Sequence, residues 1–255
     1  MHEIGHFYDE LADYYHLIYT DWDSSIRKQA ESLSAVIKGH FDGHPKKVLD
    51  AACGIGTQAL GLAQLGYRVS ASDVSEAALE KASQFAAERG LSLEFWKADM
   101  RSVHEVFSER FDVAIACDNS IPHLLSDEEI LEAFKAFHQV LIPGGLAIIS
   151  VRDYAEMDLG GIQVHPRLVH DDNGVRHVLC DVWEFDGGKY SITIYVIVDQ
   201  EGHYPEIQAI RSGSCYCVTI DKLRSLFLEA GFAQVDLLKE HYFQPLIVAR
   251  KAAGA

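Results

Sequence analysis

Residues 48–57, Val48-Leu49-Asp50-Ala51-Ala52-Cys53-Gly54-Ile55-Gly56-Thr57, decide the fold of this chain. An apolar run ends in an aspartate and passes through two glycines into the helix-like segment 58–65, which predicts a strand, a tight turn and a helix N-terminus. Glycine lets a ligand lie against such a turn because it has no Cβ and tolerates positive φ. The third glycine of a dinucleotide fingerprint is absent, since position 59 is Ala. We therefore expect Asp50 to favour a cationic ligand end over a pyrophosphate.

The composition limits the class of protein. The chain has 255 residues, 48% of them hydrophobic, which is enough for one large α/β domain. Its formal net charge of −16 argues against a nucleic-acid partner, because such proteins carry a basic footprint. No apolar run is long enough to span a bilayer, and no signal-peptide pattern is present. The five scattered cysteines are typical of a reducing compartment, so we expect a cytoplasmic protein. We also expect a small-molecule substrate and no membrane partner, and a homo-oligomer is possible.

Strand and helix signals alternate over 46–152, as in a parallel sheet. The expected strands are 48–51, 68–72, 92–97, 111–117 and 146–151, with a turn at 143–145. Residues 153–218 are expected to form an antiparallel insertion, with strands at 176–186, 190–198 and 207–218. A closing part, 219–255, has a helix at 221–230 and strands at 233–238 and 243–249. All four parts, beginning with a helical cap at 1–45, belong to one domain.

The N-terminal cap is rich in aromatic residues. Ser24-Ser25 predicts the start of a helix that runs to Lys38. Most of the aromatic side chains are expected in the core, and one or two tyrosines at a substrate chamber. His2-Glu3-Ile4-Gly5-His6 matches the zinc pattern H-E-x-x-H, but termini fray and Gly5 weakens a helix. We expect no metal site.

Polar residues follow each of the five expected strands. They are Asp50 and Gly54, Asp73, Asp99, Asn119 and Arg152. Ligands bind at the carboxyl ends of the strands in an open parallel sheet, so these residues predict a binding site. An acid after the second strand can accept both ribose hydroxyls, as it does also in NAD sites. Asp99 and Met100 suit an adenine amine and its ring face, although Met100 equally suits plain core packing.

The region from Asp50 to Val151 resembles the class I S-adenosylmethionine (SAM) methyltransferases, and more narrowly the glycine and glycine/sarcosine N-methyltransferases. Residues 117–124, Cys-Asp-Asn-Ser-Ile-Pro-His-Leu, resemble that family's N-S-F-x-H-L segment. Residues 141–146 resemble its R-P-G-G turn, and residues 150–154, Ser-Val-Arg-Asp-Tyr, its H-R-N-Y segment. The resemblance implies a Rossmann-like sheet of seven mostly parallel strands, with the last strand antiparallel. It also implies SAM as the cofactor and S-adenosylhomocysteine as its product.

The resemblance also implies residue roles. Arg152 would hold a substrate carboxylate, with Tyr8, Tyr15 and Tyr154 as further substrate-binding residues. Asn119, Tyr19 and His123 would be catalytic. The residues expected to bind the cofactor are Arg27, Asp50, Ala51, Gly54, Gly56, Asp73, Val74, Asp99, Met100, Cys117 and Asn119. Arginine suits a carboxylate because its planar fork binds both oxygens.

These roles favour methylation of the amine of an amino acid or of a similar carboxylate-bearing metabolite. An amine needs only to be neutral and aligned with the methyl group. One alternative is O- or S-methylation of another small metabolite with His123 as the base, although His123 equally suits a structural, helix-capping role. Another is a SAM-binding partner subunit without catalytic activity.

Overall fold

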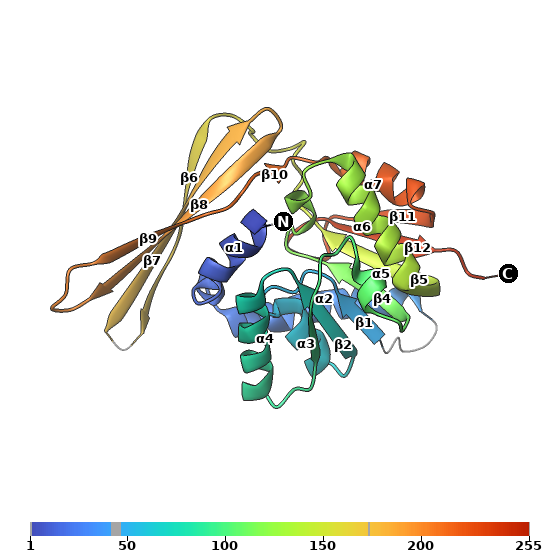
Figure 1. Ribbon diagram of the computed structural model, residues 1–255, viewed down its shortest axis with the longest axis horizontal. Coiled ribbons are helices and arrows are strands. Elements are labelled where there is room, and N and C mark those ends of the chain that lie inside the picture. The colour runs from blue at the N-terminus through green and yellow to red at the C-terminus, as the bar shows by residue number, and fades with distance from the viewer. Residues whose placement is uncertain (1, 42–46, 173, 255) are drawn as a thin grey trace.

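A seven-stranded sheet forms the centre of the computed structural model, which describes residues 2–41, 47–172 and 174–254 (Figure 1). The strand order is β11-β12-β5-β4-β1-β2-β3, and only β12 runs antiparallel to its neighbours. The strands are β1 (Lys47–Asp50), β2 (Arg68–Asp73), β3 (Glu94–Lys97), β4 (Phe111–Ala116), β5 (Leu141–Ser150), β11 (Phe232–Leu238) and β12 (Leu246–Lys251). The predicted Rossmann-like fold is confirmed. The predicted boundary at 45/46 lies outside the described residues.

Helices cover both faces of this sheet. Because successive strand residues point to opposite faces, Val48 joins the core under α2 (Trp22–His40) and α3 (Thr57–Gln64), and Leu49 joins the core under α6 (Asp127–Val140) and α7 (Ile220–Glu229). Phe134 of α6 stacks on Phe227 of α7 with 3.6 Å between ring centroids. The remaining helices are α4 (Glu76–Glu88), beside α2 and α3, and the short α5 (Val103–Val106).

Strand β5 begins earlier than predicted. The sequence indicates a turn at 143–145 followed by a strand from 146, whereas the structure has one irregular strand from Leu141. Pairing with β4 jumps from Phe111↔Leu141 to Val113↔Leu146, so the extra residues bulge out. Gly144 has φ +79°, which places the glycine of the predicted turn within that bulge.

The N-terminal cap consists of α1 (His2–Leu11), a 3₁₀ turn η1 (Tyr15–Ile18) and α2. Helix α2 begins at Trp22 rather than at Ser24-Ser25, because the Asp21 carboxylate caps it by accepting from the Ser24 N–H at 2.8 Å. Asp9 ties α1 to the start of α4 through the Ser75 hydroxyl at 2.6 Å. Of the H-E-x-x-H pattern, His6 is exposed and pairs with Glu10 at 3.6 Å; the side chains of His2 and Glu3 lie outside the described residues.

The antiparallel insertion projects from the body as a twisted arm (Figure 1). Its strands are β6 (Ile162–Asp172), β7 (Val175–Asp186), β8 (Lys189–Gln200), β9 (Glu206–Arg211) and β10 (Cys215–Tyr216). The hairpin of β7 and β8 is confirmed, but β6 was not predicted, since Pro166 interrupts its strand pattern. Residues 212–214 divide the predicted third strand into β9 and β10, which pair with different parts of β8. Helix α1 packs on this sheet through Phe7 and Leu11.

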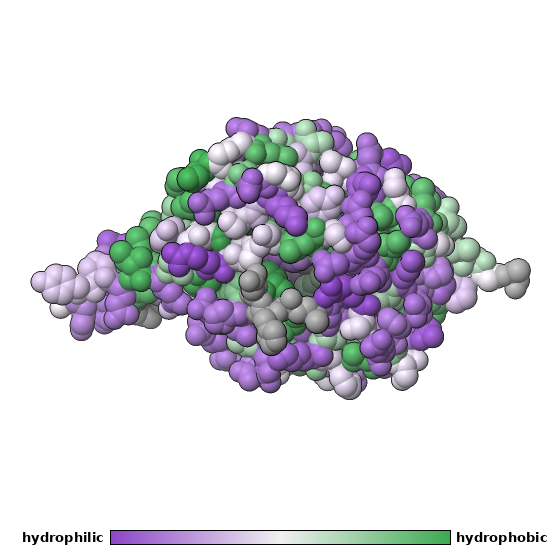
Figure 2. All heavy atoms as spheres, turned by 45° about the horizontal axis from the view of Figure 1, so that its top comes forward, coloured by the Kyte–Doolittle hydropathy of each residue, from purple (hydrophilic) through white to green (hydrophobic). Residues whose placement is uncertain are grey.

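The surface is mainly polar. Figure 2 shows hydrophilic residues over most of one face, interrupted by smaller hydrophobic patches. Within the described ranges, no helix combines the length and apolar character needed to cross a membrane.

Candidate active site

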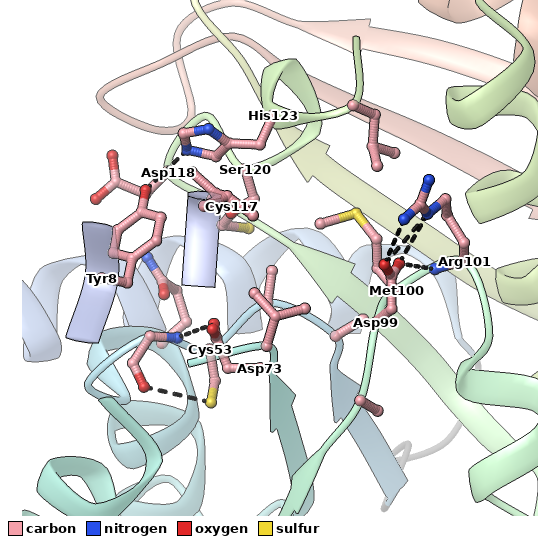
Figure 3. Close-up of a pocket in the computed structure, with 18 of the residues that line it drawn as sticks. Tyr8, Cys53, Asp73, Asp99, Met100, Arg101, Cys117, Asp118, Ser120 and His123 are labelled. Carbon is pink, nitrogen blue, oxygen red and sulfur yellow. Dashed lines mark hydrogen bonds and ion pairs between the residues drawn. The ribbon is translucent and has the colours of Figure 1, made fainter. Parts of the chain in front are cut away.

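A cavity of about 940 Å³ opens at the carboxyl ends of β1, β2, β3 and β4 (Figure 3). It lies beside β1, on one side of which the chain adds β2 and β3 and on the other side β4. Ligands usually bind at this point of such a sheet. Seven of the residues predicted to bind the cofactor line it: Ala51, Gly54, Asp73, Val74, Asp99, Met100 and Cys117. Three of them, Gly54, Asp73 and Asp99, belong to the set of polar and glycine residues expected at the strand ends.

The glycine turn leaves space that a side chain would fill. Gly54 has φ +51°, and a Cβ there would lie 3.1 Å from Cε1 of Tyr15. Its N–H donates to the Asp73 carboxylate at 2.8 Å, which fixes the turn against β2. Asp50 is fully buried below the turn, and burial raises its pKa to about 7. Asp50 and Gly56 do not line the cavity, so they support the turn from beneath.

Asp73 and Asp99 present carboxylates to the two halves of this cavity. Asp73 is buried and accepts from the N–H groups of Gly54 and Ser75. Arg101 holds Asp99 in place, since its Nη2 donates to Asp99 Oδ2 at 2.7 Å (Figure 3). Its Nη1 donates to Glu129 at 2.8 Å. Although burial opposes it, the hydrogen bonds from Arg101 lower the pKa of Asp99, which keeps it ionised. Arg101 was not predicted, because an arginine four residues after a strand has no distinctive pattern.

These residues fit the parts of SAM. Gly54 lines the cavity without a side chain, so a ligand can lie close to its backbone, where the methionine part would lie. Asp73 lies at the end of β2, where a carboxylate can accept ribose hydroxyls. Met100 is partly buried against the core and also lines the cavity, so it packs in the core and reaches the space where the adenine ring is predicted to lie.

A second cavity, of about 1170 Å³, adjoins the first. The two share the lining residues Tyr8, Tyr15, Tyr19, Asp118 and His123. The second cavity extends between the N-terminal cap and β8, and it also contains Asn119 and Arg152. The three predicted tyrosines of the N-terminal cap thus lie at the junction. We call this second space the acceptor cavity.

Arg152 is a cation in the acceptor cavity without a carboxylate partner. Its guanidinium lies over the Trp183 ring, 4.8 Å from the centroid. Among the described residues no carboxylate forms an ion pair with it. Burial opposes its charge, but nearby tyrosine hydroxyls and Asp118 raise its pKa, so it remains charged. An unpaired, largely enclosed guanidinium is suited to binding an anionic group.

Asn119 organises the base of the acceptor cavity. Its Nδ2 donates to the hydroxyls of Tyr154 at 2.8 Å and Tyr190 at 3.1 Å, and its Oδ1 accepts from the Arg152 N–H at 3.1 Å. Tyr154 is buried behind this network and does not line the cavity, whereas Tyr190, which was not predicted, does. The Asn119 amide makes its hydrogen bonds with these neighbouring residues, so in this structure its role is to position Arg152 and Tyr190.

Asp118 lies at the junction of the cavities and was not predicted. It and Asn119 have positive φ angles of 56° and 64°, a backbone conformation uncommon outside glycine and costly enough to suggest function. The Tyr19 hydroxyl donates to Asp118 Oδ2 at 2.8 Å. Asp118 is one step from the predicted Asn119, but sequence alone does not show which way its side chain points.

His123 bridges α1 and the insertion. Its Nε2 lies 2.8 Å from the Tyr8 hydroxyl and its Nδ1 3.5 Å from Cys215 Sγ. Burial, and to a lesser degree the charge of Arg152, lowers the pKa of His123 to about 4. The imidazole is therefore neutral at physiological pH and is a weak base there.

Arg27 does not reach either cavity. It is exposed on the outer face of α2, where its Nη2 donates to Ser24 Oγ at 3.3 Å. The next residue, Lys28, lines the acceptor cavity instead, because one step along a helix turns a side chain by about 100°. In this structure Arg27 is therefore not placed to bind the carboxylate of a cofactor, contrary to the prediction.

Comparison with known proteins connects this geometry to one family. Residues 48–145 match the methyltransferase-domain family. A protein of Geobacillus sp. (strain WCH70) that carries the name methyltransferase is 30% identical over 235 residues, which cover 91% of this chain and 89% of that protein. The glycine/sarcosine N-methyltransferase of Aphanothece halophytica is 35% identical over 136 residues, 52% of this chain but only 51% of that relative's length.

A solved structure has the same fold. SAM-bound CalS10, an amino pentose methyltransferase from Micromonospora echinaspora, superposes with a TM-score of 0.74 at 19% identity. The match covers 89% of this chain and 92% of that one. At this identity the likeness establishes the fold alone.

Proposed function

This chain belongs to the class I SAM-dependent methyltransferases, and we propose that it methylates the amine of an amino acid or of a similar small molecule that carries a carboxylate. The observation that carries the proposal is Arg152, an unpaired guanidinium held over Trp183 in a cavity that adjoins the cofactor cavity. A carboxylate is a suitable partner for its fork of N–H donors. The partial match to a glycine/sarcosine N-methyltransferase supports an amine acceptor.

When bound, SAM supplies a methyl group on a sulfonium sulfur. The chain itself has to hold the acceptor so that the nitrogen lone pair faces the junction of the cavities. Arg152 would fix the carboxylate end, and Asn119 and Trp183 would keep Arg152 in place. The acceptor enters mostly as an ammonium ion and gives up one proton to solvent before it reacts.

The junction suits a reaction that needs no strong base. Burial raises the pKa values of Tyr8, Tyr15 and Tyr19, so all three remain neutral phenols. The low pKa of His123 also makes it a poor base at neutral pH. A hydroxyl acceptor would need such a base, whereas a neutral amine would not. The electrostatics of the junction thus favour an amine over an alcohol.

Arg152→Ala and Arg152→Lys test the proposal. Both variants should bind SAM within about twofold of wild type in calorimetric titrations, since Arg152 does not line the cofactor cavity. Losing charge-assisted hydrogen bonds, worth ~1.5–3 kcal/mol, should lower kcat/KM for carboxylate-bearing amines by roughly 10–150-fold in Arg152→Ala. The lysine variant should retain part of the activity. Arg176→Ala, on the arm beside Asp199, is the matched control. Unchanged kcat/KM in Arg152→Ala would contradict the carboxylate role.

A further inference from the structure

The base of the acceptor cavity carries two opposite charges. Asp118 is the only acidic residue among the described residues that line this cavity, and Arg152 follows the neighbouring strand. The cavity is also lined by Arg167, which pairs with Asp181, and by Lys28 of α2. The strand ends are tied together, because the Asn119 N–H donates to the Ser150 carbonyl at 3.1 Å and the Asp118 N–H donates to Ser150 Oγ at 2.6 Å. Neither charge neutralises the other through a direct ion pair, so both are available to a ligand.

The conformation of Asp118 directs its carboxylate to the junction. A positive φ is unfavourable for a residue with a Cβ, and glycine would adopt it without strain. Here the strained residue bears a charge that lines both cavities and accepts a hydrogen bond from Tyr19. A carboxylate in this position can bind a cationic group at the place where the methyl group is transferred.

One wall of the acceptor cavity is apolar. Phe7 and Leu11 come from α1, Ile18 from η1, and Ile192 and Ile194 from β8. These five side chains offer an apolar surface much larger than a glycine substrate could cover. Glycine would leave this wall in contact with water, whereas an apolar side chain would gain from burial against it.

We propose that the acceptor is an amino acid with an apolar side chain larger than that of glycine. Its amino group binds Asp118 as an ammonium and gives up one proton to solvent before methyl transfer, its carboxylate binds Arg152, and its side chain lies against the wall formed by α1 and β8. This inference rests on the proposed function and specifies its substrate class. Asp118 is then a substrate-binding residue that places the amine at the junction, while the charge pair selects zwitterions over simple amines or acids.

Binding is tested first, with no methyl transfer. Calorimetric titrations of the protein saturated with S-adenosylhomocysteine use phenylalanine, glycine, N-acetylphenylalanine, which lacks the ammonium, and phenethylamine, which lacks the carboxylate. Phenylalanine should bind at least tenfold more tightly than each of the other three. Glycine binding as tightly as phenylalanine would overturn the inference, and so would phenethylamine doing so.

Variants then test each contact. Asp118→Asn and Asp118→Gly should each weaken phenylalanine binding at least tenfold, the glycine variant without backbone strain. Asp199→Asn, an acid-to-amide change on the distal arm, should leave it unchanged. Ile192→Trp should weaken phenylalanine binding much more than glycine binding, because the larger side chain fills the space beside the apolar wall. Wild-type affinity for phenylalanine in both Asp118 variants would refute the role of Asp118.

Release of S-adenosylhomocysteine is then measured with the same compounds and with the hydroxy-acid and mercapto-acid analogues of phenylalanine. If glycine is the best acceptor, the proposed function stands and the inference on substrate size fails. If only the hydroxy acid, the mercapto acid or phenethylamine is methylated, the proposed function fails, and the inference with it.

Discussion

Replacing Gly54 with alanine should weaken cofactor binding through a contact that the structure defines. The new Cβ would lie 3.1 Å from Cε1 of Tyr15, closer than the optimal carbon–carbon separation of ~3.5–4.0 Å. Tyr15 must therefore move by a few tenths of an ångström, and it lines both cavities. Alanine at φ +51° also costs ~1–2 kcal/mol in backbone strain. We expect the affinity for SAM to fall about tenfold, or ~1.4 kcal/mol.

Gly66→Ala is the matched control for this variant. Gly66 also has a positive φ, +88°, but a Cβ there meets no atom within 4 Å. Both variants should lose ~1–2 kcal/mol of unfolding free energy in urea titrations, from strain alone. Only Gly54→Ala should lose SAM affinity in calorimetry. Wild-type affinity in Gly54→Ala, or an equal loss in Gly66→Ala, would refute the reasoning.

Two further predictions concern His123 and Arg101. The pKa of His123 is about 4 in the folded protein, against an ordinary 6.5. The unfolded chain therefore binds the proton at a higher pH, and the free energy of unfolding falls by up to about 3 kcal/mol as the pH drops from 6.5 to 4. Urea titrations should show a smaller loss in His123→Gln; equal losses would contradict the low pKa. Arg101→Ala should weaken SAM binding several-fold, because Asp99 loses the guanidinium that orients it. The exposed Arg224→Ala should not change SAM binding, and an unaltered affinity in Arg101→Ala would show that Asp99 needs no such support.

The cofactor side of the site could be read from the sequence because it follows the strands. Gly54, Asp73 and Asp99 lie at or within four residues of the ends of β1, β2 and β3, and parallel strands bring their carboxyl ends to one edge. Local order along the chain therefore fixes where these side chains lie in space. The parallel strands β1 to β5 were predictable for the same reason, since strand and helix signals alternate along 46–152. The seven-stranded sheet with its antiparallel last strand was predicted from the family resemblance.

The acceptor side was less predictable because distant segments build it. Tyr190 of β8 and Trp183 of β7 meet Arg152 only once the insertion folds back onto the core. Arg27 and Lys28 differ by one helix position, which the sequence pattern could not resolve without the start of α2. The orientation of Asp118 depends on a backbone angle that no pattern of residue types reveals.

The most direct test of the central claim is to locate the transferred methyl group. The protein is incubated with SAM labelled with ¹³C in its methyl group and a mixture of amino acids, matched carboxylate-free amines and hydroxy acids, and the products are identified by NMR. We expect the ¹³C-methyl label on the amino nitrogen of a carboxylate-bearing amine, and we expect this labelled product to be absent with Arg152→Ala. Label on oxygen or sulfur, or only on amines without a carboxylate, would contradict it.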